Sequence, residues 1–292
     1  MRILITGAQG QLAQDCQQVL RENFELRLYN HQELDITQPD QVDRTLTNDT
    51  PDLVLNCAAY NQVDDCETHR ERAYQCNVLG PKYLALAAAK IMAPLIHIST
   101  NYVFDGKKTL PQGYTEEDLP SPLSYYGKTK WEGEQAVREI SPRNLVIRTA
   151  WLYGIHGWNF PKTLLQSAAQ GKSISITKDQ FASFTWTHRL AEQIKGVIVA
   201  SGQGLYHATA EGFSSRYEMA KLLFEILNIE VKIIPCNSDS FKTAAIRPKN
   251  SILENQRLKS EGINTMKPWA EDLKEFISRY KSELLMIFRS MR

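Results

Sequence analysis

Two tyrosines stand directly ahead of two lysines in the segment SPLSYYGKTKWEGEQAV, residues 121–137. Side chains four residues apart on a helix lie one above the other, so Tyr126 and Lys130 pair closely if this segment is helical. Tyr125 and Lys128 are three residues apart and form a second, weaker pair. A tyrosine beside a lysine can transfer protons, although most pairs at this spacing only pack on a helix surface.

The chemistry expected of Tyr126 is acid catalysis on a carbonyl group. A free phenol has a pKa near ~10, and a nearby ammonium group lowers that pKa because it stabilises the phenolate. Tyr126 would protonate a carbonyl oxygen while a nicotinamide delivers hydride to the carbon, and Lys130 could also hold the nicotinamide ribose. Thr100 ends the apolar run HIST, where its hydroxyl would stabilise the same oxygen or, alternatively, only bond the local turn.

A glycine pattern near the N-terminus fits the binding of a dinucleotide. Gly7 and Gly10 in ITGAQGQLAQ follow the first apolar run and open a helical pattern. Glycines permit a tight turn and close approach of a pyrophosphate, which the free N–H groups of the helix N-terminus then bind. Ala13 stands near the place of a third glycine and is still small. A plain strand-to-helix turn is the alternative interpretation.

The second apolar run, ELRLY, is followed by NHQ and has no acid at its end. An acid at that position would bind the adenosine ribose hydroxyls of NAD, so its absence favours NADPH. Asp35 comes a few residues later, where it would contact the adenine end of the cofactor or cap the following helix.

The elements that must position these residues alternate between short apolar runs and helical patterns. Strands are predicted over residues 2–6, 25–29, 52–56, 94–99 and 144–149. Helices are predicted over residues 11–22, 159–170 and 216–227. Because such runs suit strands covered on both faces, their alternation with helices predicts an α/β fold with a doubly wound, Rossmann-type parallel sheet. Ligands bind at the carboxyl ends of the strands of such a sheet.

The pattern loosens after residue 150, which suggests two lobes. We expect residues 1–150 to form an NAD(P)-binding Rossmann domain. Residues 151–292 would form mainly a smaller C-terminal substrate-binding lobe, with the chain crossing back to the first domain. The last helical pattern carries an apolar stripe that should pack on the protein's own body, a dimer contact being the alternative. That stripe consists of Trp269, Leu273, Phe276, Ile277, Tyr280 and Leu284.

Composition excludes several classes of protein. With 34 Lys and Arg against 33 Asp and Glu, the chain has no basic excess for nucleic acid or an anionic membrane. No apolar run reaches the length of a membrane span, and the N-terminus has no signal-peptide pattern, so a cytoplasmic location is expected. The five cysteines form no C-x-x-C pair and the six histidines no H-x-x-x-H spacing, so no metal site is predicted.

The motifs together resemble the extended short-chain dehydrogenase/reductase family over nearly the whole chain. Those that carry the resemblance are ILITGAQGQL, PDLVLNCAAYNQVDDCE, NVLGPKYLA, HISTNYVFDG, YGKTKWEGE, RTAWLYG, NFPKTLL, DQF and RPKNSIL. RTAWLYG and NFPKTLL are similar to the branch that reduces dTDP-linked keto-deoxy sugars, and they differ from the sugar epimerases of the same fold. The resemblance implies NADPH-dependent reduction of the 4-keto group of dTDP-4-dehydro-6-deoxy-L-mannose, which gives dTDP-L-rhamnose.

The resemblance also implies roles for particular residues. It makes Thr100, Tyr126 and Lys130 the catalytic set, which selects Tyr126 over Tyr125, and it places Thr100, Asn101 and Trp151 at the substrate. The residues implied to bind the cofactor are Gly7, Gly10, Gln11, Leu12, Asp35, Ile36, Ala58, Ala59, Tyr60, Asn61, Ile98, Tyr126 and Lys130. NADPH is the cofactor implied, with NADH as the alternative. Some members form homodimers and some bind magnesium, for which the sequence offers no location.

Two departures from the family pattern bear on which sugar is used. Asn101 replaces a usual aspartate after Ser99-Thr100, so a neutral amide stands where the family has a charged acceptor. After DQF the chain has ASFT in place of Gly-x-Pro-Thr, with Phe184 at the proline position. The segment 182–185 would border the nucleotide end of the substrate.

Three other functions compete with this interpretation. One is reduction of a different nucleotide-linked keto sugar. Another is that of an NADP-binding regulatory subunit, similar to the β-subunit of methionine adenosyltransferase. A third is an epimerase or dehydratase that holds NAD tightly. The complete Thr100, Tyr126 and Lys130 set and the motif around Trp151 favour a reductase.

Overall fold

The computed structural model describes residues 1–171 and 173–290. Its centre is a six-stranded parallel sheet with the strand order β10-β5-β4-β3-β1-β2. The strands are β1 (Arg2–Thr6), β2 (Glu25–Tyr29), β3 (Leu53–Asn56), β4 (Leu95–Thr100), β5 (Leu145–Thr149) and β10 (Gly204–His207). The predicted α/β fold with a doubly wound parallel sheet is therefore confirmed.

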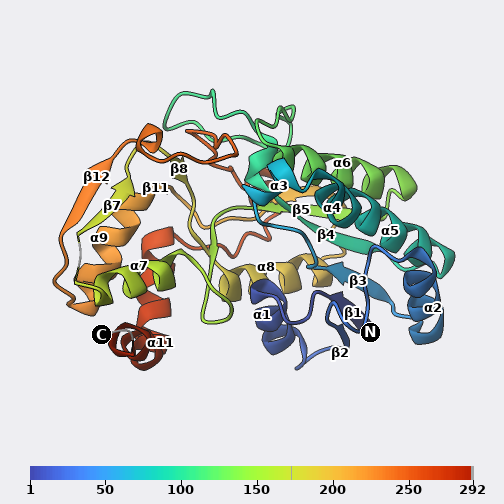
Figure 1. Ribbon diagram of the computed structural model, residues 1–292. Helices are drawn as coiled ribbons and strands as arrows, with labels where there is room; N and C mark the ends of the chain where they lie inside the picture. The colour runs from blue at the N-terminus through green and yellow to red at the C-terminus, as the bar shows by residue number, and fades with distance from the viewer. Residues whose placement is uncertain (172, 291–292) are drawn as a thin grey trace.

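Two layers of helices cover this sheet because successive side chains of each strand point to opposite faces. Ile3 and Ile5 pack on one face with α1 (Gln11–Leu20) and α8 (Thr187–Val199). Leu4 packs on the other face with α2 (Pro39–Asp49), α5 (Gly80–Lys90) and α6 (Tyr125–Ile140). Figure 1 shows α1 and α8 together on one side and α5 and α6 on the other.

The sixth strand, β10, reaches the sheet from beyond residue 151 and pairs with β5 over the register Gly204↔Leu145 to His207↔Arg148. Its helix, α8, packs against α1 on the same face. Residues of the second half of the chain therefore complete the central sheet.

A second body of structure faces the sheet's carboxyl edge (Figure 1). Its core is built by α7 (Phe160–Ala169), α9 (Arg216–Leu227) and α11 (Trp269–Arg289). Short strand pairs join these helices: β6 (Leu152–Tyr153) with β9 (Thr185–Trp186), β7 (Ile174–Thr177) with β12 (Ile233–Cys236), and β8 (Phe181–Ala182) with β11 (Ser214–Ser215). The apolar stripe of α11 packs into this core through Leu273, Phe276, Ile277 and Leu284, as expected.

The remaining elements are short and lie mainly in connections. They are α3 (Asp65–Thr68), α4 (Arg70–Tyr74), the π-helical turn η1 (Gln75–Leu79), η2 (Asn101–Val103), η3 (Ser238–Ser240) and α10 (Gln256–Ser260). None of the helices in the described part of the chain is long and apolar enough to cross a membrane.

Candidate active site

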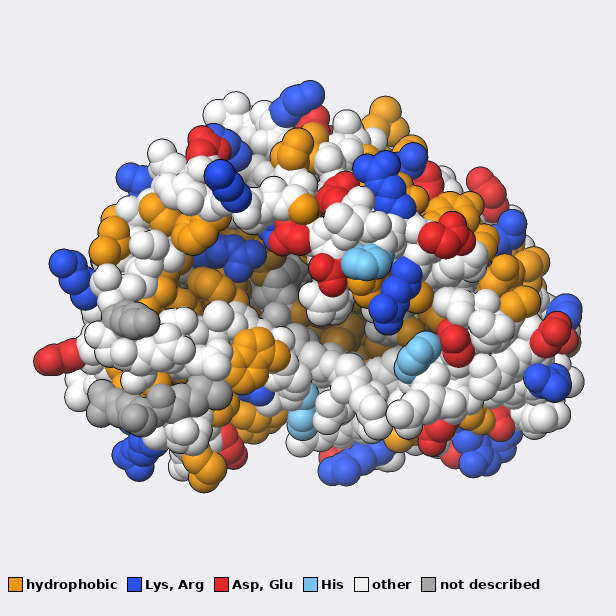
Figure 2. Space-filling view, in the orientation of Figure 1, with side chains coloured by type: hydrophobic (Ala, Val, Ile, Leu, Met, Phe, Trp, Pro, Cys, Tyr) orange, Lys and Arg blue, Asp and Glu red, His pale blue; other side chains and the backbone are white. Residues whose placement is uncertain are grey.

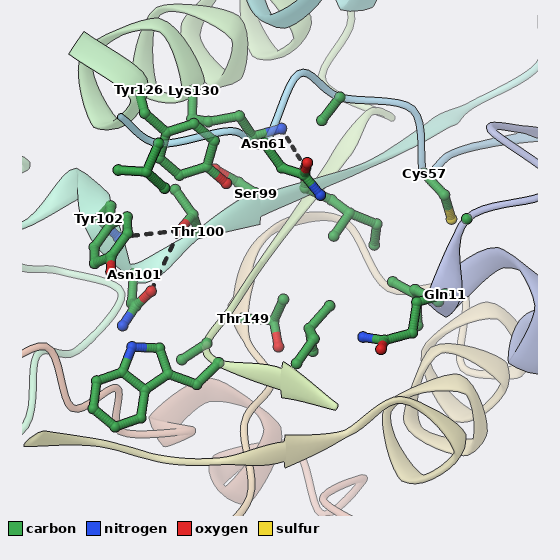
Figure 3. Close-up of a pocket in the computed structure, with 18 of the residues that line it drawn as sticks. Gln11, Cys57, Asn61, Ser99, Thr100, Asn101, Tyr102, Tyr126, Lys130 and Thr149 are labelled. Carbon is green, nitrogen blue, oxygen red and sulfur yellow. Dashed lines mark hydrogen bonds between the residues drawn. The ribbon is translucent and has the colours of Figure 1, made fainter. Parts of the chain in front are cut away.

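A cavity of about 370 Å³ opens at the carboxyl ends of the central strands, between the sheet and the second body. Figure 2 shows the same face hollowed between the two halves, with apolar side chains inside. Many of the residues predicted from sequence line this one cavity: Gly10, Gln11, Leu12, Ala59, Asn61, Ile98, Thr100, Asn101, Tyr126, Lys130 and Trp151. Phosphate-loop and Tyr-Lys residues, more than a hundred positions apart, therefore share one space (Figure 3).

The other predicted cofactor residues lie around this cavity or beyond it. Gly7 and Ala58 lie behind its wall, packed against each other, and the Tyr60 backbone N–H donates to Asn77 Oδ1 at 2.9 Å. Asp35 lines a separate cavity of about 520 Å³, which His31, Arg70 and Arg72 also line. Ile36 is buried against Gly80.

The glycine loop has the geometry of an anion cradle. Gly7 has φ +65°, and a Cβ there would lie 2.9 Å from the Ala58 backbone, so only glycine fits. The Gly10 N–H closes the turn on the Gly7 carbonyl at 2.7 Å. No side chain caps the N-terminus of α1 and its first turn holds no acid, so its leading N–H groups are available to phosphate oxygens.

Two glycines let helix α6 pack directly on the main chain of the turns η2 and η1. Ser124 caps its N-terminus by accepting the Gly127 N–H at 3.1 Å. A Cβ on Gly127 would lie 2.1 Å from the Tyr102 carbonyl oxygen, and one on Gly133 would lie 2.1 Å from the Asn77 carbonyl oxygen. The helix therefore rests on main chain at both points, which brings Tyr126 and Lys130 over the end of β4.

Tyr126 points its ring into the cavity beside the end of β4 (Figure 3). Its ring meets that of Tyr102 edge to face, with centroids 5.8 Å apart. Burial raises the pKa of Tyr126 well above its usual range, and the nearby Thr100 hydroxyl offsets part of that shift. The phenol therefore carries its proton at neutral pH, as an acid must.

Lys130 is 2% exposed, and its Nζ donates to the Ile98 carbonyl oxygen at 2.7 Å. The same nitrogen lies 3.3 Å from His97 Nε2. Burial lowers the pKa of Lys130 to about 8. We expected the ammonium group to lower the pKa of Tyr126, but burial of the phenol dominates here, because Lys130 Nζ is directed at β4.

Thr100 and Asn101 follow β4 and are held by a short hydrogen-bond chain. The Thr100 hydroxyl accepts the Tyr102 N–H at 3.2 Å and donates to Asn101 Oδ1 at 3.3 Å (Figure 3). Asn101 Nδ2 donates to the hydroxyl and the carbonyl of Ser251 at 2.8 and 3.1 Å. A carboxylate could not make these donations, so Asn101 ties the strand end to the RPKNSIL segment in a way that aspartate would not.

Trp151 begins the second body with a strained backbone. Its φ is +41°, a left-handed value that costs a bulky residue energy and is often found at functional sites. Its ring packs on Phe184 at 4.7 Å and on the Arg216 guanidinium at 4.5 Å. The buried Trp151 Nε1 and Thr149 Oγ1 have no hydrogen-bond partner in the described structure, and both residues line the cavity.

A further cavity of about 670 Å³ lies on the second body, beyond Trp151. Arg216 and Arg247 line it, and both guanidinium groups lie near the Tyr102 hydroxyl. Arg247 forms an ion pair with Asp64 at 2.6 Å, while Arg216 has no carboxylate partner among residues 1–171 and 173–290. We did not predict either arginine from sequence. Arg216 opens RYEMAKLLFEIL, which is equally typical of an ordinary amphipathic helix, and Arg247 opens RPKNSIL, a motif of the resemblance in which the arginine was given no role.

Beneath the site lies a buried ion pair. Glu134 and Arg148 are 0% and 1% exposed, and Arg148 Nη2 donates to Glu134 Oε2 at 2.6 Å. The Ser99 hydroxyl also donates to Glu134, at 2.5 Å. This pair joins α6 to β4 and β5.

The described residues contain no group of three or more His, Cys, Asp or Glu side chains that could hold a metal ion.

Known proteins resemble the chain along almost its entire length. Residues 1–282 match the family model described as the RmlD substrate binding domain. A probable dTDP-4,6-dihydroxy-2-methyloxan-3-one 4-ketoreductase of Streptomyces antibioticus is 38% identical over 94% of each chain. A dTDP-4-dehydrorhamnose reductase of Mycolicibacterium smegmatis is 36% identical over 95% of this chain and 85% of its own. The crystal structure of dTDP-4-dehydrorhamnose reductase from Bacillus anthracis in complex with NADP is 37% identical, with a TM-score of 0.92 over 95% of this chain and 99% of that chain.

Proposed function

Because the chain belongs to the family described as the RmlD substrate binding domain, we propose that it is an NADPH-dependent reductase of a dTDP-linked keto sugar. Its reaction is the reduction of the 4-keto group of dTDP-4-dehydro-6-deoxy-L-mannose, which yields dTDP-L-rhamnose. The observation that carries this proposal is the shared cavity in which Thr100, Tyr126 and Lys130 face the phosphate loop.

The residues of the cavity divide the work of a carbonyl reduction. Bound NADPH supplies the hydride. Tyr126, which keeps its proton at neutral pH, donates that proton to the carbonyl oxygen as negative charge develops there. The Thr100 hydroxyl turns from Asn101 to donate to the same oxygen, which stabilises the charge further.

The cradle of Gly7, Gly10 and the uncapped α1 supports the binding of a dinucleotide pyrophosphate. Two features support NADPH over NADH. The end of β2 lacks an acid, and His31 and Arg72 line the cavity that Asp35 shares. A relative from Bacillus anthracis has been crystallised with NADP.

We assign the nucleotide part of the substrate to the cavity of Arg216 and Arg247. The pair of Trp151 and Arg216 separates that cavity from the one that holds Tyr126. A diphosphate between the two cavities would supply the anion that Arg216 lacks. A homodimer and a cytoplasmic location stay predictions from the sequence.

The test is direct. Purified protein mixed with NADPH and dTDP-4-dehydro-6-deoxy-L-mannose should oxidise the NADPH and form dTDP-L-rhamnose, identified by mass spectrometry and NMR. A parallel panel of nucleotide-linked keto sugars tests the reductase of a different sugar, which Asn101 and Phe184 make the leading alternative. Tight NADPH binding without oxidation on any sugar would favour a regulatory subunit instead.

Replacing Arg216 with glutamine should raise KM for the sugar nucleotide by about 10–100-fold, since a charge-assisted hydrogen bond contributes roughly 1.5–3 kcal/mol. KM for NADPH should change little. Lys221→Gln, on an exposed position of the same helix, is the matched control and should leave both constants unchanged. An equal effect of Arg216→Gln on both substrates would remove the assignment of the nucleotide site.

A further inference from the structure

A buried hydrogen-bond chain runs through the sheet from β1 to the nitrogen of Lys130. Asn56, at the end of β3, accepts the Thr6 hydroxyl at 2.7 Å and the Ala58 backbone N–H at 3.1 Å, both on Oδ1. Asn56 Nδ2 lies 3.0 Å from His97 Nδ1, and His97 Nε2 lies 3.3 Å from Lys130 Nζ. Thr6, Asn56 and His97 are completely buried.

The direction of this chain is fixed by one group that cannot reverse. A backbone N–H can only donate, so the Ala58 N–H requires the oxygen of Asn56, and not its NH₂ group, at that position. Asn56 Nδ2 therefore donates to His97, and His97 Nδ1 must offer its lone pair.

The protonation of the His97 ring follows from the same logic. Burial, and then the charge of Lys130, hold the pKa of His97 well below its usual range, so the ring is neutral. A neutral imidazole with a lone pair on Nδ1 carries its hydrogen on Nε2. The ring thus presents an N–H, and no lone pair, to the nitrogen of Lys130.

An ammonium group has three donors and no acceptor, whereas a neutral amine has a lone pair that accepts a hydrogen bond. We propose that Asn56 and His97 are positioning residues for Lys130: they present an N–H to its nitrogen, and so favour the amine over the ammonium. Lys130 then loses its proton more readily than it would beside a buried partner that accepts a hydrogen bond from the ammonium group. This inference rests on the proposed reductase function.

The other groups around Lys130 explain why its ammonium and amine forms are close in free energy. Glu134 on α6 and Cys57 after β3 both favour the ammonium form, and the Ile98 carbonyl accepts from it. Burial and the His97 N–H oppose them. Tyr126 lies one helical turn before Lys130 on the same face and is neutral at this pH. The net pKa of Lys130, about 8, lies close to neutrality, so the gain or loss of one hydrogen bond at Nζ changes the fraction of Lys130 that is charged.

The test is the direction in which a variant shifts the pH dependence of kcat. Lys130 lines the reaction cavity, where its positive charge favours the negative charge that develops on the carbonyl oxygen, so kcat should fall as pH rises through about 8, where Lys130 becomes neutral. Replacing His97 with methionine removes the opposing N–H and should raise the pH at which kcat falls by about one unit. A downward move would show that His97 accepts a hydrogen bond from the ammonium, and no move would show that it has no influence; either overturns the inference.

Two further variants keep the test decisive if His97→Met does not fold. Asn56→Asp still accepts from Ala58 and Thr6 but cannot donate, so His97 would carry its hydrogen on Nδ1 and offer Nε2 to Lys130. This variant should also raise the pH at which kcat falls, and because its added negative charge would act in the same direction, the position of the His97 ring hydrogen decides the result. Thr6→Val is the control, because the Ala58 N–H alone still orients Asn56. In this variant kcat should fall at the same pH as in the wild type.

A readout that does not depend on turnover separates this inference from the proposed function. In ¹⁵N-histidine-labelled protein, NMR should show the His97 ring protonated on Nε2 in the wild type and in Thr6→Val, and on Nδ1 in Asn56→Asp. A wild-type ring protonated on Nδ1 overturns the inference even in an active reductase. An Nε2-protonated ring in a protein that reduces no sugar would leave the assignment of the His97 hydrogen standing and end the proposed function.

Discussion

Replacing Tyr126 with phenylalanine is expected to lower kcat by about 10²–10⁴-fold, the usual contribution of a positioned general acid. The change removes one oxygen atom from a ring that lines the cavity, so the fold and the edge-to-face contact with Tyr102 should persist. NADPH affinity should change little, because the phosphate loop is untouched. Steady-state turnover and NADPH binding by fluorescence titration measure the two quantities separately.

Tyr125→Phe is the matched control for this variant. The Tyr125 ring lies under the Arg70 guanidinium at 5.0 Å, and its backbone N–H donates to Glu67 at 2.8 Å. Loss of its hydroxyl should leave turnover nearly unchanged. Full activity in Tyr126→Phe, or a large loss in Tyr125→Phe, would show that Tyr126 is not the acid.

Replacing Glu134 with glutamine is expected to destabilise the protein by about 3–5 kcal/mol, the usual effect of removing one partner of a buried ion pair. Arg148 would keep its charge in the core without a carboxylate, and the new amide would direct an N–H toward the guanidinium. The midpoint of unfolding in urea, followed by circular dichroism, measures this loss.

Two comparisons isolate the cause of that destabilisation. Glu132 is paired with Lys128 at 3.8 Å on the solvent side of the same helix, and Glu132→Gln should change stability by no more than about 0.5 kcal/mol. The double variant Glu134→Leu with Arg148→Met removes both charges and should be more stable than Glu134→Gln. If the double variant is less stable than the single one, the uncompensated charge is not the source.

The first five strands of the central sheet could be predicted from sequence because each is a short segment rich in apolar residues. The five predicted strands agree with β1 to β5 to within one residue at each end. Strand β10 escaped prediction because its sequence, GLYH, has only two adjacent apolar residues, and its place in the sheet depends on pairing with β5. The short strand pairs of the second body escaped for the same reason.

The site was partly predictable for a related reason. Tyr126 and Lys130 are close in sequence, and Thr100 ends a strand, so local rules place them at one edge of the sheet. Arg216 lies in a segment whose sequence carries no sign of the site. Arg247 opens RPKNSIL, which carries the family resemblance but gives the arginine no role, because the roles of both residues depend on contacts with Trp151 and Asp64. His97 was hidden inside an apolar run, where a single buried histidine gives no signal of its partners.

The protonation of Tyr126 shows where sequence reasoning stops. The spacing of Tyr126 and Lys130 predicts a charge effect between them, but burial competes with that effect and depends on the whole surrounding structure. Only coordinates show that Lys130 Nζ is held by β4 through Ile98 and His97.

The contact of Gly127 and Gly133 with the carbonyls of Tyr102 and Asn77 limits which part of the site can adjust to a substrate. Side chains can yield by changing rotamer, but main chain in direct contact with main chain leaves α6 no room to slide or roll. Tyr126, the proton donor, should therefore keep its position during turnover. Sugars of different shape would have to be accommodated at the opposite wall, where the ring of Trp151 packs on the guanidinium group of Arg216.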